Sequence, residues 1–274
     1  MNRSCQWIAF HPSRWVLATI GALVASAVFF PGPAVSGDLG PVEECMRRNL
    51  PERASVRGIS LLSVDRTGSQ RKLTGKLYWK RWSADRSGLL MRLDSPPDVR
   101  RSSYLVLQDG HQEQMFVYLP NMQRVRRIHP DTASGSLFGT DFSYSDLRYL
   151  QMLESIVISE RLEDGVVGER PAYHVRMRAK PGEKSPYDRV DAMIDQETCV
   201  PLQIEFFGSN GSLEKRLTTP VDSLTREGAI WVARSVALRD LRNETSTSLD
   251  VDRIDVEGDV SDRLFTVTRL ERGR

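Results

Sequence analysis

Two sets of residues near the middle of the chain carry the kinds of side chain that chemistry needs. Arg124, Arg126 and Arg127 stand close together and could hold an anionic head group or a phosphate. Asp141 and Asp146 follow and could form an acid pair in a cleft, as a hydrolase would need. Simpler interpretations exist for both sets. The arginines could form a solvated strand face, while Asp146 caps a helix and Asp141 pairs with an arginine.

Other catalytic motifs are missing from the sequence. It has no Gly-x-Ser-x-Gly elbow, no His-Glu-x-x-His, no Cys-x-x-Cys and no phosphate-binding loop. His111, His129 and His174 are not spaced as metal ligands, and we interpret them as solvated. We therefore expect a protein that is not an enzyme and holds neither a metal nor a cofactor.

The first 36 residues have the features of a secretory signal peptide. Arg3 and Arg14 supply positive charge, and an apolar run extends from Trp15 to Phe30. Ala34 and Ser36 place small residues where a signal peptidase cleaves. The alternative is an uncleaved membrane anchor, but the run is shorter than the roughly 20 apolar residues that cross a bilayer. We expect cleavage after residue 36.

The remaining chain, residues 37–274, has no net charge. The whole chain has 38 Lys and Arg against 36 Asp and Glu, and the two extra arginines both belong to the predicted signal peptide. A neutral exported protein is a poor candidate for binding nucleic acid. No later segment is long and apolar enough to cross a membrane. We expect residues 37–274 to form one periplasmic domain and to be monomeric.

Two cysteines remain in this part, Cys45 and Cys199. An even number of cysteines in an oxidising compartment favours a disulfide, although two separate buried thiols are the alternative. The bond would close a loop of about 155 residues and add ~4–5 kcal/mol of stability at most.

The pattern beyond a short helix at residues 41–50 is that of antiparallel strands. Apolar and polar residues alternate in runs of about 8–12 residues between turns such as Asp109-Gly110 and Asn210-Gly211. We expect about ten or eleven strands, too many for one flat sheet without strong curling. The fold class is therefore mainly β, with a few short helices.

One amphipathic helix interrupts the strands within residues 136–154. Ser143 precedes Asp146 by three residues, which is the spacing of a capping box. Leu147, Leu150 and Leu153 then recur at helical spacing. A helix placed between two groups of strands could cover the opening of a curled sheet.

The apolar faces of the strands suggest an enclosed space for a ligand. Curled sheets line such a space with alternate residues, and methionine suits a site for variable acyl chains. The alternative is a solid core made of the same residues. The candidates are Leu73, Leu77, Trp79, Met91, Leu93, Met115, Val117, Val175, Met177, Ile204 and Phe206.

Several segments resemble one known family, and together they cover most of residues 42–270. The segments Tyr118 to Ile128 and Gly135 to Leu147 resemble the outer-membrane lipoprotein-sorting (LolA-like) proteins, and in particular their less characterised branch. Ile194 to Gly208 and the later Gly211-Ser-Leu are similar to that branch as well.

The resemblance implies a half-open, strongly curved antiparallel β-barrel whose mouth is closed by helices and whose cavity accepts acyl chains. It implies a periplasmic chaperone that carries lipid or lipoprotein between an inner-membrane exporter, of ABC or RND type, and an acceptor in the outer membrane. The alternative is an accessory envelope protein that docks onto an RND-type transporter without carrying a ligand.

Handover of a ligand would need an opening motion at the mouth of the sheet. Gly135 and Gly139 are candidate hinges, and Arg124, Arg126 and Arg127 are candidate contacts for a head group. The residues expected to form the mouth and lid are Leu137, Phe138, Phe142, Leu147 and Leu150.

Overall fold

Two groups of antiparallel strands, separated in the sequence by a short helix, make up the fold. The computed structural model describes residues 37–110, 112–129, 132–150, 157–256 and 258–272. The predicted signal peptide, residues 1–36, lies outside the described residues, as do His111 and Leu153.

The first group follows helix α1 (Gly40–Arg48). Its strands are β1 (Ala54–Val64), β2 (Gln70–Arg81), β3 (Arg86–Ser95), β4 (Ser103–Asp109), β5 (Gln112–Leu119) and β6 (Arg124–Ile128). Helix α2 (Tyr144–Leu150) comes next.

The second group continues to the C-terminal segment. Its strands are β7 (Val157–Arg161), β8 (Gly165–Val167), β9 (Arg170–Ala179), β10 (Arg189–Asp195), β11 (Pro201–Phe207), β12 (Leu213–Thr218), β13 (Leu224–Glu227), β14 (Ile230–Ala233), β15 (Ser235–Asp240) and β16 (Thr245–Asp255). Three short helices complete the chain: the 3-10 turns η2 (Val221–Ser223) and η3 (Asp262–Phe265), and helix α3 (Val267–Arg272).

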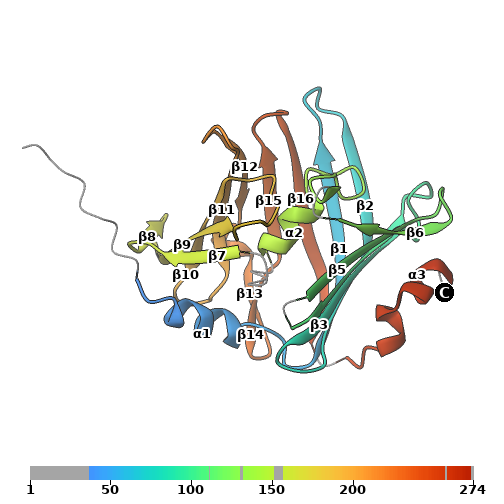
Figure 1. The fold of residues 1–274 in the computed structure, drawn as a ribbon, viewed down its shortest axis with the longest axis horizontal. Helices are drawn as coiled ribbons and strands as arrows, with labels where there is room; N and C mark the ends of the chain where they lie inside the picture. Colours follow the sequence, from blue (N-terminus) through green and yellow to red (C-terminus); the bar gives the residue numbers. More distant parts are fainter. Residues whose placement is uncertain (1–36, 111, 130–131, 151–156, 257, 273–274) are drawn as a thin grey trace, which may run out of the picture. The chain divides into compact units, whose positions relative to one another are not determined.

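Fourteen of the described strands form one antiparallel sheet, in the order β6-β5-β4-β3-β2-β1-β16-β15-β12-β11-β10-β9-β7, with β8 paired to β9. The sheet is not closed, because β6 and β7 are its two edges, and it bends around α2 (Figure 1). The expected mainly β, half-open curved sheet is confirmed. The count exceeds the ten or eleven strands expected, because short strands such as β8 carry too few residues to show alternation.

The sheet has an inner face, which surrounds α2, and an outer face. Alternation places Leu73, Met91 and Val117 on the inner face, within the larger of two apolar clusters. Leu90 and Leu105 belong to the second cluster, on the outer face, where η3 and α3 cover β3 to β6. Both faces of β4 are therefore buried.

Helix α1 is attached to the second group of strands by a disulfide. Cys45 is bonded to Cys199, with 5.4 Å between the Cα atoms, which confirms the expected pair. Cys199 lies in the turn between β10 and β11, and both cysteines are buried. The helix ends at Arg48, before the expected Leu50, whose side chain is exposed.

Candidate functional site

The inner face brings together every residue predicted to line a cavity. Nine of them are buried in one cluster, and Leu77 and Trp79 pack against it with part of their surface exposed. They come from both groups of strands, which the pairing of β1 with β16 joins into one surface. The apolar surface is thus continuous across the junction between the two groups.

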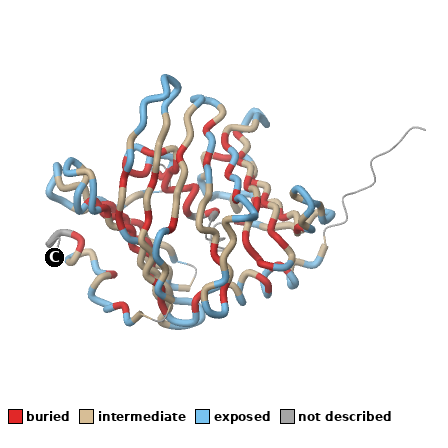
Figure 2. Tube along the Cα trace, turned by 180° about the vertical axis from the view of Figure 1, so that it is seen from behind, coloured by how far each residue is buried: buried red, intermediate tan, exposed pale blue. Residues whose placement is uncertain are grey.

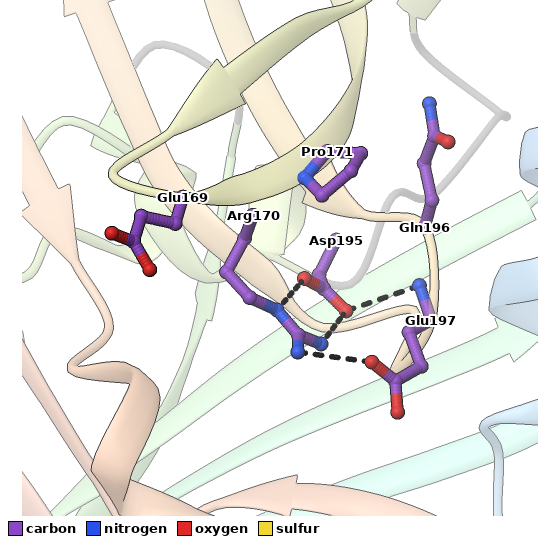
Figure 3. A pocket seen from close by; sticks show the side chains of 6 residues that line it. All are labelled: Glu169, Arg170, Pro171, Asp195, Gln196 and Glu197. Atoms are coloured by element: carbon purple, nitrogen blue, oxygen red, sulfur yellow. Dashed lines mark hydrogen bonds and ion pairs between the residues drawn. The ribbon is translucent and has the colours of Figure 1, made fainter.

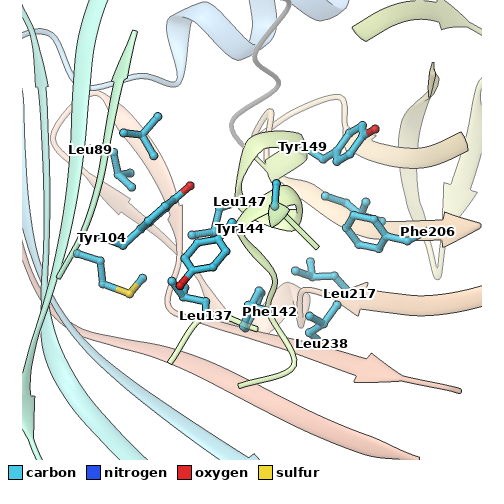
Figure 4. Packing of buried hydrophobic residues seen from close by; sticks show 14 of the residues in the cluster. Leu89, Tyr104, Leu137, Phe142, Tyr144, Leu147, Tyr149, Phe206, Leu217 and Leu238 are labelled. Carbon is cyan, nitrogen blue, oxygen red and sulfur yellow. The ribbon is translucent and has the colours of Figure 1, made fainter. Parts of the chain in front are cut away.

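Residues 133–150, which we call the plug, lie against this inner face. Leu137, Phe138, Phe142 and Leu147 of the predicted lid are buried there. Figure 4 shows Leu137, Phe142 and Leu147 between a wall that carries Tyr104 and an opposite wall that carries Phe206 and Leu217. The side chain of Leu150 lies outside the described part. The predicted lid is therefore a segment packed into the fold rather than a rim above it.

The loop of the plug is held by its own backbone. Leu137 N donates to Phe142 O at 2.7 Å, and Ser145 N donates to Ala133 O at 2.8 Å. Gly139, a candidate hinge, has a φ of +80°, and a Cβ there would lie 2.8 Å from the Arg71 guanidinium. The position thus favours glycine for two reasons.

A capping box begins helix α2, as its sequence spacing predicts. Ser143 N donates to Asp146 Oδ2 at 2.7 Å, and Asp146 N donates to Ser143 Oγ at 3.0 Å. The Asp146 carboxylate has two further partners on the sheet side. Lys215 Nζ of β12 donates to Oδ2 at 2.9 Å, and the Tyr187 hydroxyl donates to Oδ1 at 2.6 Å. One buried carboxylate therefore caps the helix and fixes it to the sheet.

Removing the cap hydroxyl gives a direct test of this arrangement. The variant Ser143→Ala is expected to lose about 1 kcal/mol of unfolding free energy, because Asp146 N would lose its acceptor. Urea unfolding followed by circular dichroism measures this loss. Ser209→Ala, in an exposed turn, is the control and should stay within about 0.5 kcal/mol of the parent. Equal stability of the two variants would contradict the capping role.

Asp141 anchors the other end of the plug loop, but not through an arginine. Its carboxylate accepts hydrogen bonds from the hydroxyls of Thr245 and Thr247 on β16, the second at 2.6 Å. Lys215 Nζ also donates to the Asp141 carbonyl oxygen at 2.7 Å. Asp141 and Asp146 are thus both engaged in holding the plug, and Lys215 contacts both residues.

Two tyrosines beside these groups have shifted pKa values. Burial, reinforced by the Asp146 carboxylate, raises the pKa of Tyr187, so its hydroxyl stays protonated and donates to Asp146. Burial also raises the pKa of Tyr144, against the opposing effect of the nearby Arg126 guanidinium. Arg126 therefore lies close to the plug.

The three arginines of β6 do not converge on one site. The register pairs Arg124 with Leu119 and Arg126 with Val117, so both arginines share the inner face. Arg127 pairs with Phe116 and lies on the outer face. All three are exposed. Only Arg124 and Arg126 could meet a head group at this edge of the inner face.

The inner face also carries an arginine that the sequence pattern did not single out, Arg57 of β1. Its cross-strand partners are Leu77 on β2 and Ile254 on β16, and both pack against the inner cluster. Its Nε is buried and has no hydrogen-bond partner among the described residues. Burial lowers the pKa of Arg57, because desolvation disfavours the charged form.

Arg57 belongs to a part of the inner face that the plug leaves partly exposed. We call the half-buried residues Arg57, Leu77, Trp79, Val236, Leu249 and Ile254 the central patch. They lie on four neighbouring strands, β2, β1, β16 and β15. Figure 2 shows intermediate burial along the long strands in the middle of the sheet, with buried stretches to either side. The inner face is therefore most accessible at its middle.

A separate depression of about 330 Å³ lies at the ends of β9 and β10 (Figure 3). Arg170 donates two hydrogen bonds to Asp195, at 2.7 and 2.8 Å, and forms an ion pair with Glu197 at 2.9 Å. Burial alone would raise the pKa of Asp195, but hydrogen bonds from Arg170 and Thr198 outweigh it and lower the pKa. These charged groups pair with one another and stabilise the turn between β10 and β11, which is a structural role.

Among the described residues, no group of three or more His, Cys, Asp or Glu side chains is arranged to hold a metal ion. No described helix combines the length and apolar character that crossing a membrane requires.

The fold is similar to that of proteins described as lipoprotein-sorting or LolA superfamily proteins. The chain matches an outer membrane lipoprotein-sorting protein domain from Vibrio parahaemolyticus with a TM-score of 0.76 and 20% identity, over 85% of this chain and 98% of that one. It matches a DUF1329 family protein from Desulfovibrio piger with a TM-score of 0.74 and 21% identity, over 84% and 97%. A LolA superfamily protein from Nitrosomonas europaea gives a TM-score of 0.61 and 15% identity, over 85% and 98%.

These structural matches establish the fold. A family model described as "uncharacterized protein"-like matches residues 85–272, more than half of the chain, so the protein belongs to that family. A search of the curated proteins found no match.

Proposed function

We propose that the protein is a periplasmic carrier that binds the acyl chains of a lipid or a lipoprotein on its inner face. The observation that carries the proposal is one continuous apolar surface, drawn from both groups of strands and partly exposed at the central patch. The structural relatives are lipoprotein-sorting and LolA superfamily proteins, which supports the same assignment. On this proposal residues 1–36 are the cleaved signal peptide, and residues 37–274 form one binding domain.

Binding would work by differential burial rather than by a reaction. Each methylene group moved from water onto the apolar face contributes ~0.8 kcal/mol, so an acyl chain of ordinary length is held strongly. The plug covers much of the same face, so a bound chain either lies along the central patch or takes the place of plug side chains. Release to an outer-membrane acceptor would then follow when the plug returns. No enzyme activity is required.

Native mass spectrometry of protein purified without detergent, together with titration by a fluorescent fatty-acyl probe, tests the carrier. Co-purifying lipid or saturable probe binding is expected. If neither is found, the carrier proposal is wrong, and an accessory protein that docks onto a transporter without ligand becomes the better assignment.

A substitution in the central patch should remove the binding. Leu249→Glu would place a carboxylate on the acyl path, and its desolvation should weaken probe binding by at least about tenfold. Ile158→Glu is the matched control, because Ile158 is exposed at the edge strand β7 and faces outward. A thermal melt of each variant confirms that both are folded. Equal loss of affinity in the two variants would contradict the assignment of the inner face.

A further inference from the structure

Arg57 is an isolated cation on an apolar surface. Its neighbours across the strands, Leu77 and Ile254, are both apolar. The described residues include no ion pair to Arg57, and burial is the sole cause of its lowered pKa, with no carboxylate to offset it. An arginine with so high a starting pKa remains charged in spite of this shift. Partial desolvation of a charge without a partner is unfavourable, and an anionic group of a ligand would supply the missing partner.

A second polar group without a partner lies beside it. Ser55 precedes Arg57 by two residues on β1 and therefore projects to the same face. Ser55 is 1% exposed, and its Oγ has no hydrogen-bond partner among the described residues. Its cross-strand partner is Trp79 of the central patch. A guanidinium donor and a hydroxyl donor thus lie together on a face that is otherwise apolar.

We infer that Arg57 and Ser55 form an anion subsite that selects amphiphiles with a negatively charged oxygen head group. The carboxylate or phosphate of the ligand would accept hydrogen bonds from the Arg57 guanidinium and the Ser55 hydroxyl. Its acyl chain would lie on the apolar residues of the central patch. This inference rests on the proposed carrier function and adds the charge of the ligand to it.

The geometry favours an amphiphile over a small free anion. A free phosphate or acetate would gain the contact with Arg57 but would leave the surrounding apolar surface uncovered. An amphiphile would make the contact with Arg57 and would also cover the apolar surface, because Leu77 and Ile254 flank the cation directly. The exposed arginines Arg124 and Arg126 lie on the edge strand β6, four strands from β2, so they belong to a different part of the inner face.

The test compares two ligands with the same chain and different heads. Equilibrium dialysis of radiolabelled oleate and of oleyl alcohol, both delivered from cyclodextrin, gives the affinity of purified protein for each. A charge-assisted hydrogen bond in a desolvated site should favour oleate by about 10-fold to 100-fold. Arg57→Met should remove this preference and leave the affinity for oleyl alcohol within about threefold. Arg57→Lys, which keeps the charge without the guanidinium fork, should restore part of the preference.

The chain supplies a matched control in Arg92. Its Nε and Nη2 are also buried and have no hydrogen-bond partner within the described part of the chain, but it lies on the outer face of β3, opposite Lys76. Arg92→Met should leave both affinities unchanged. A third titration, with dodecyl phosphate, extends the test to a phosphate head group. Competition of inorganic phosphate against oleate tests whether the site binds an anion that has no acyl chain.

The outcomes separate the inference from the function on which it rests. Equal affinity for oleate and oleyl alcohol, unaffected by Arg57→Met, would overturn the anion subsite and leave the carrier intact. Displacement of oleate by inorganic phosphate at similar concentration would show a free-anion site and also overturn the inference. Binding of none of the three amphiphiles would contradict the carrier itself. If Arg57→Met does not fold, the milder variant Arg57→Lys is used instead, and a preference for oleate that is smaller than in the parent protein is then the expected result.

Discussion

Replacing Lys215 by methionine is expected to lower the free energy of unfolding by about 3–5 kcal/mol, more than any other single substitution considered for this protein. The side chain of Asp146 is 1% exposed and that of Lys215 is 11% exposed, so their 2.9 Å ion pair is shielded from water. Lys215→Met keeps the length of the side chain and removes the charge. Of the donors that the described residues supply, the carboxylate of Asp146 would then keep the Tyr187 hydroxyl and the Ser143 amide.

Urea unfolding monitored by tryptophan fluorescence measures this loss. The double variant Asp146→Asn with Lys215→Met should recover at least half of it, since no unpaired charge remains. Lys72→Met is the control, because Lys72 is exposed on β2 and should cost less than about 0.5 kcal/mol. If Lys215→Met costs no more than Lys72→Met, the ion pair does not hold the plug.

The same variant connects stability with ligand binding. Lys215 contacts the plug at two residues, Asp146 and the carbonyl of Asp141, so its loss should loosen residues 133–150 before the sheet. Hydrogen exchange in the plug should therefore accelerate more than exchange in β10 or β11. If the plug must leave the inner face before an acyl chain binds, the variant should bind acyl chains more tightly, because displacing the plug requires less free energy.

The capping box and the helix it begins could be predicted from sequence, because Ser143 and Asp146 are three residues apart and local spacing decides the contact. The ion pair between Lys215 and Asp146 could not be predicted in this way. Lys215 follows Asp146 by 69 residues, and only the register of β12 against β11 and β15 turns its side chain to the inner face. For the same reason the sequence suggests an arginine as one possible partner of Asp141, whereas the structure gives two threonines of β16.

Arg57 illustrates a second limit. It lies in an ordinary alternating strand, and the sequence does not say which face of that strand will meet the core. The strand 230–238 shows a third. Its alternating apolar pattern is typical of one continuous strand, but the chain leaves one sheet and enters another at Arg234, so β14 pairs with β13 and β15 joins the large sheet. The continuous apolar run of residues 104–107 in β4, by contrast, is explained by burial of both faces of the strand, one in the inner cluster and the other in the cluster that includes α3.

Removing the disulfide is the second large change expected for this protein. The double variant Cys45→Ser with Cys199→Ser should lose about 2–5 kcal/mol, because the bond spans 154 residues and restricts the unfolded chain over that length. Reduction of the parent protein should give the same midpoint of unfolding as the variant. Unfolding in urea with and without reductant makes this comparison. An unchanged midpoint in both cases would show that the bond contributes nothing.

The loss should also appear locally, because the disulfide is the covalent link between α1 and the second group of strands. Val42 is buried in the inner cluster and Met46 packs against it, so the helix covers part of that cluster. Residue Cys199, in contrast, is held in its turn by Asp195, which accepts from Thr198 N at 2.7 Å and is fixed by Arg170. We therefore expect faster hydrogen exchange in α1 than in the turn that contains Cys199. The disulfide therefore links α1, which covers part of the inner cluster, to a turn that is held by Asp195 and Arg170.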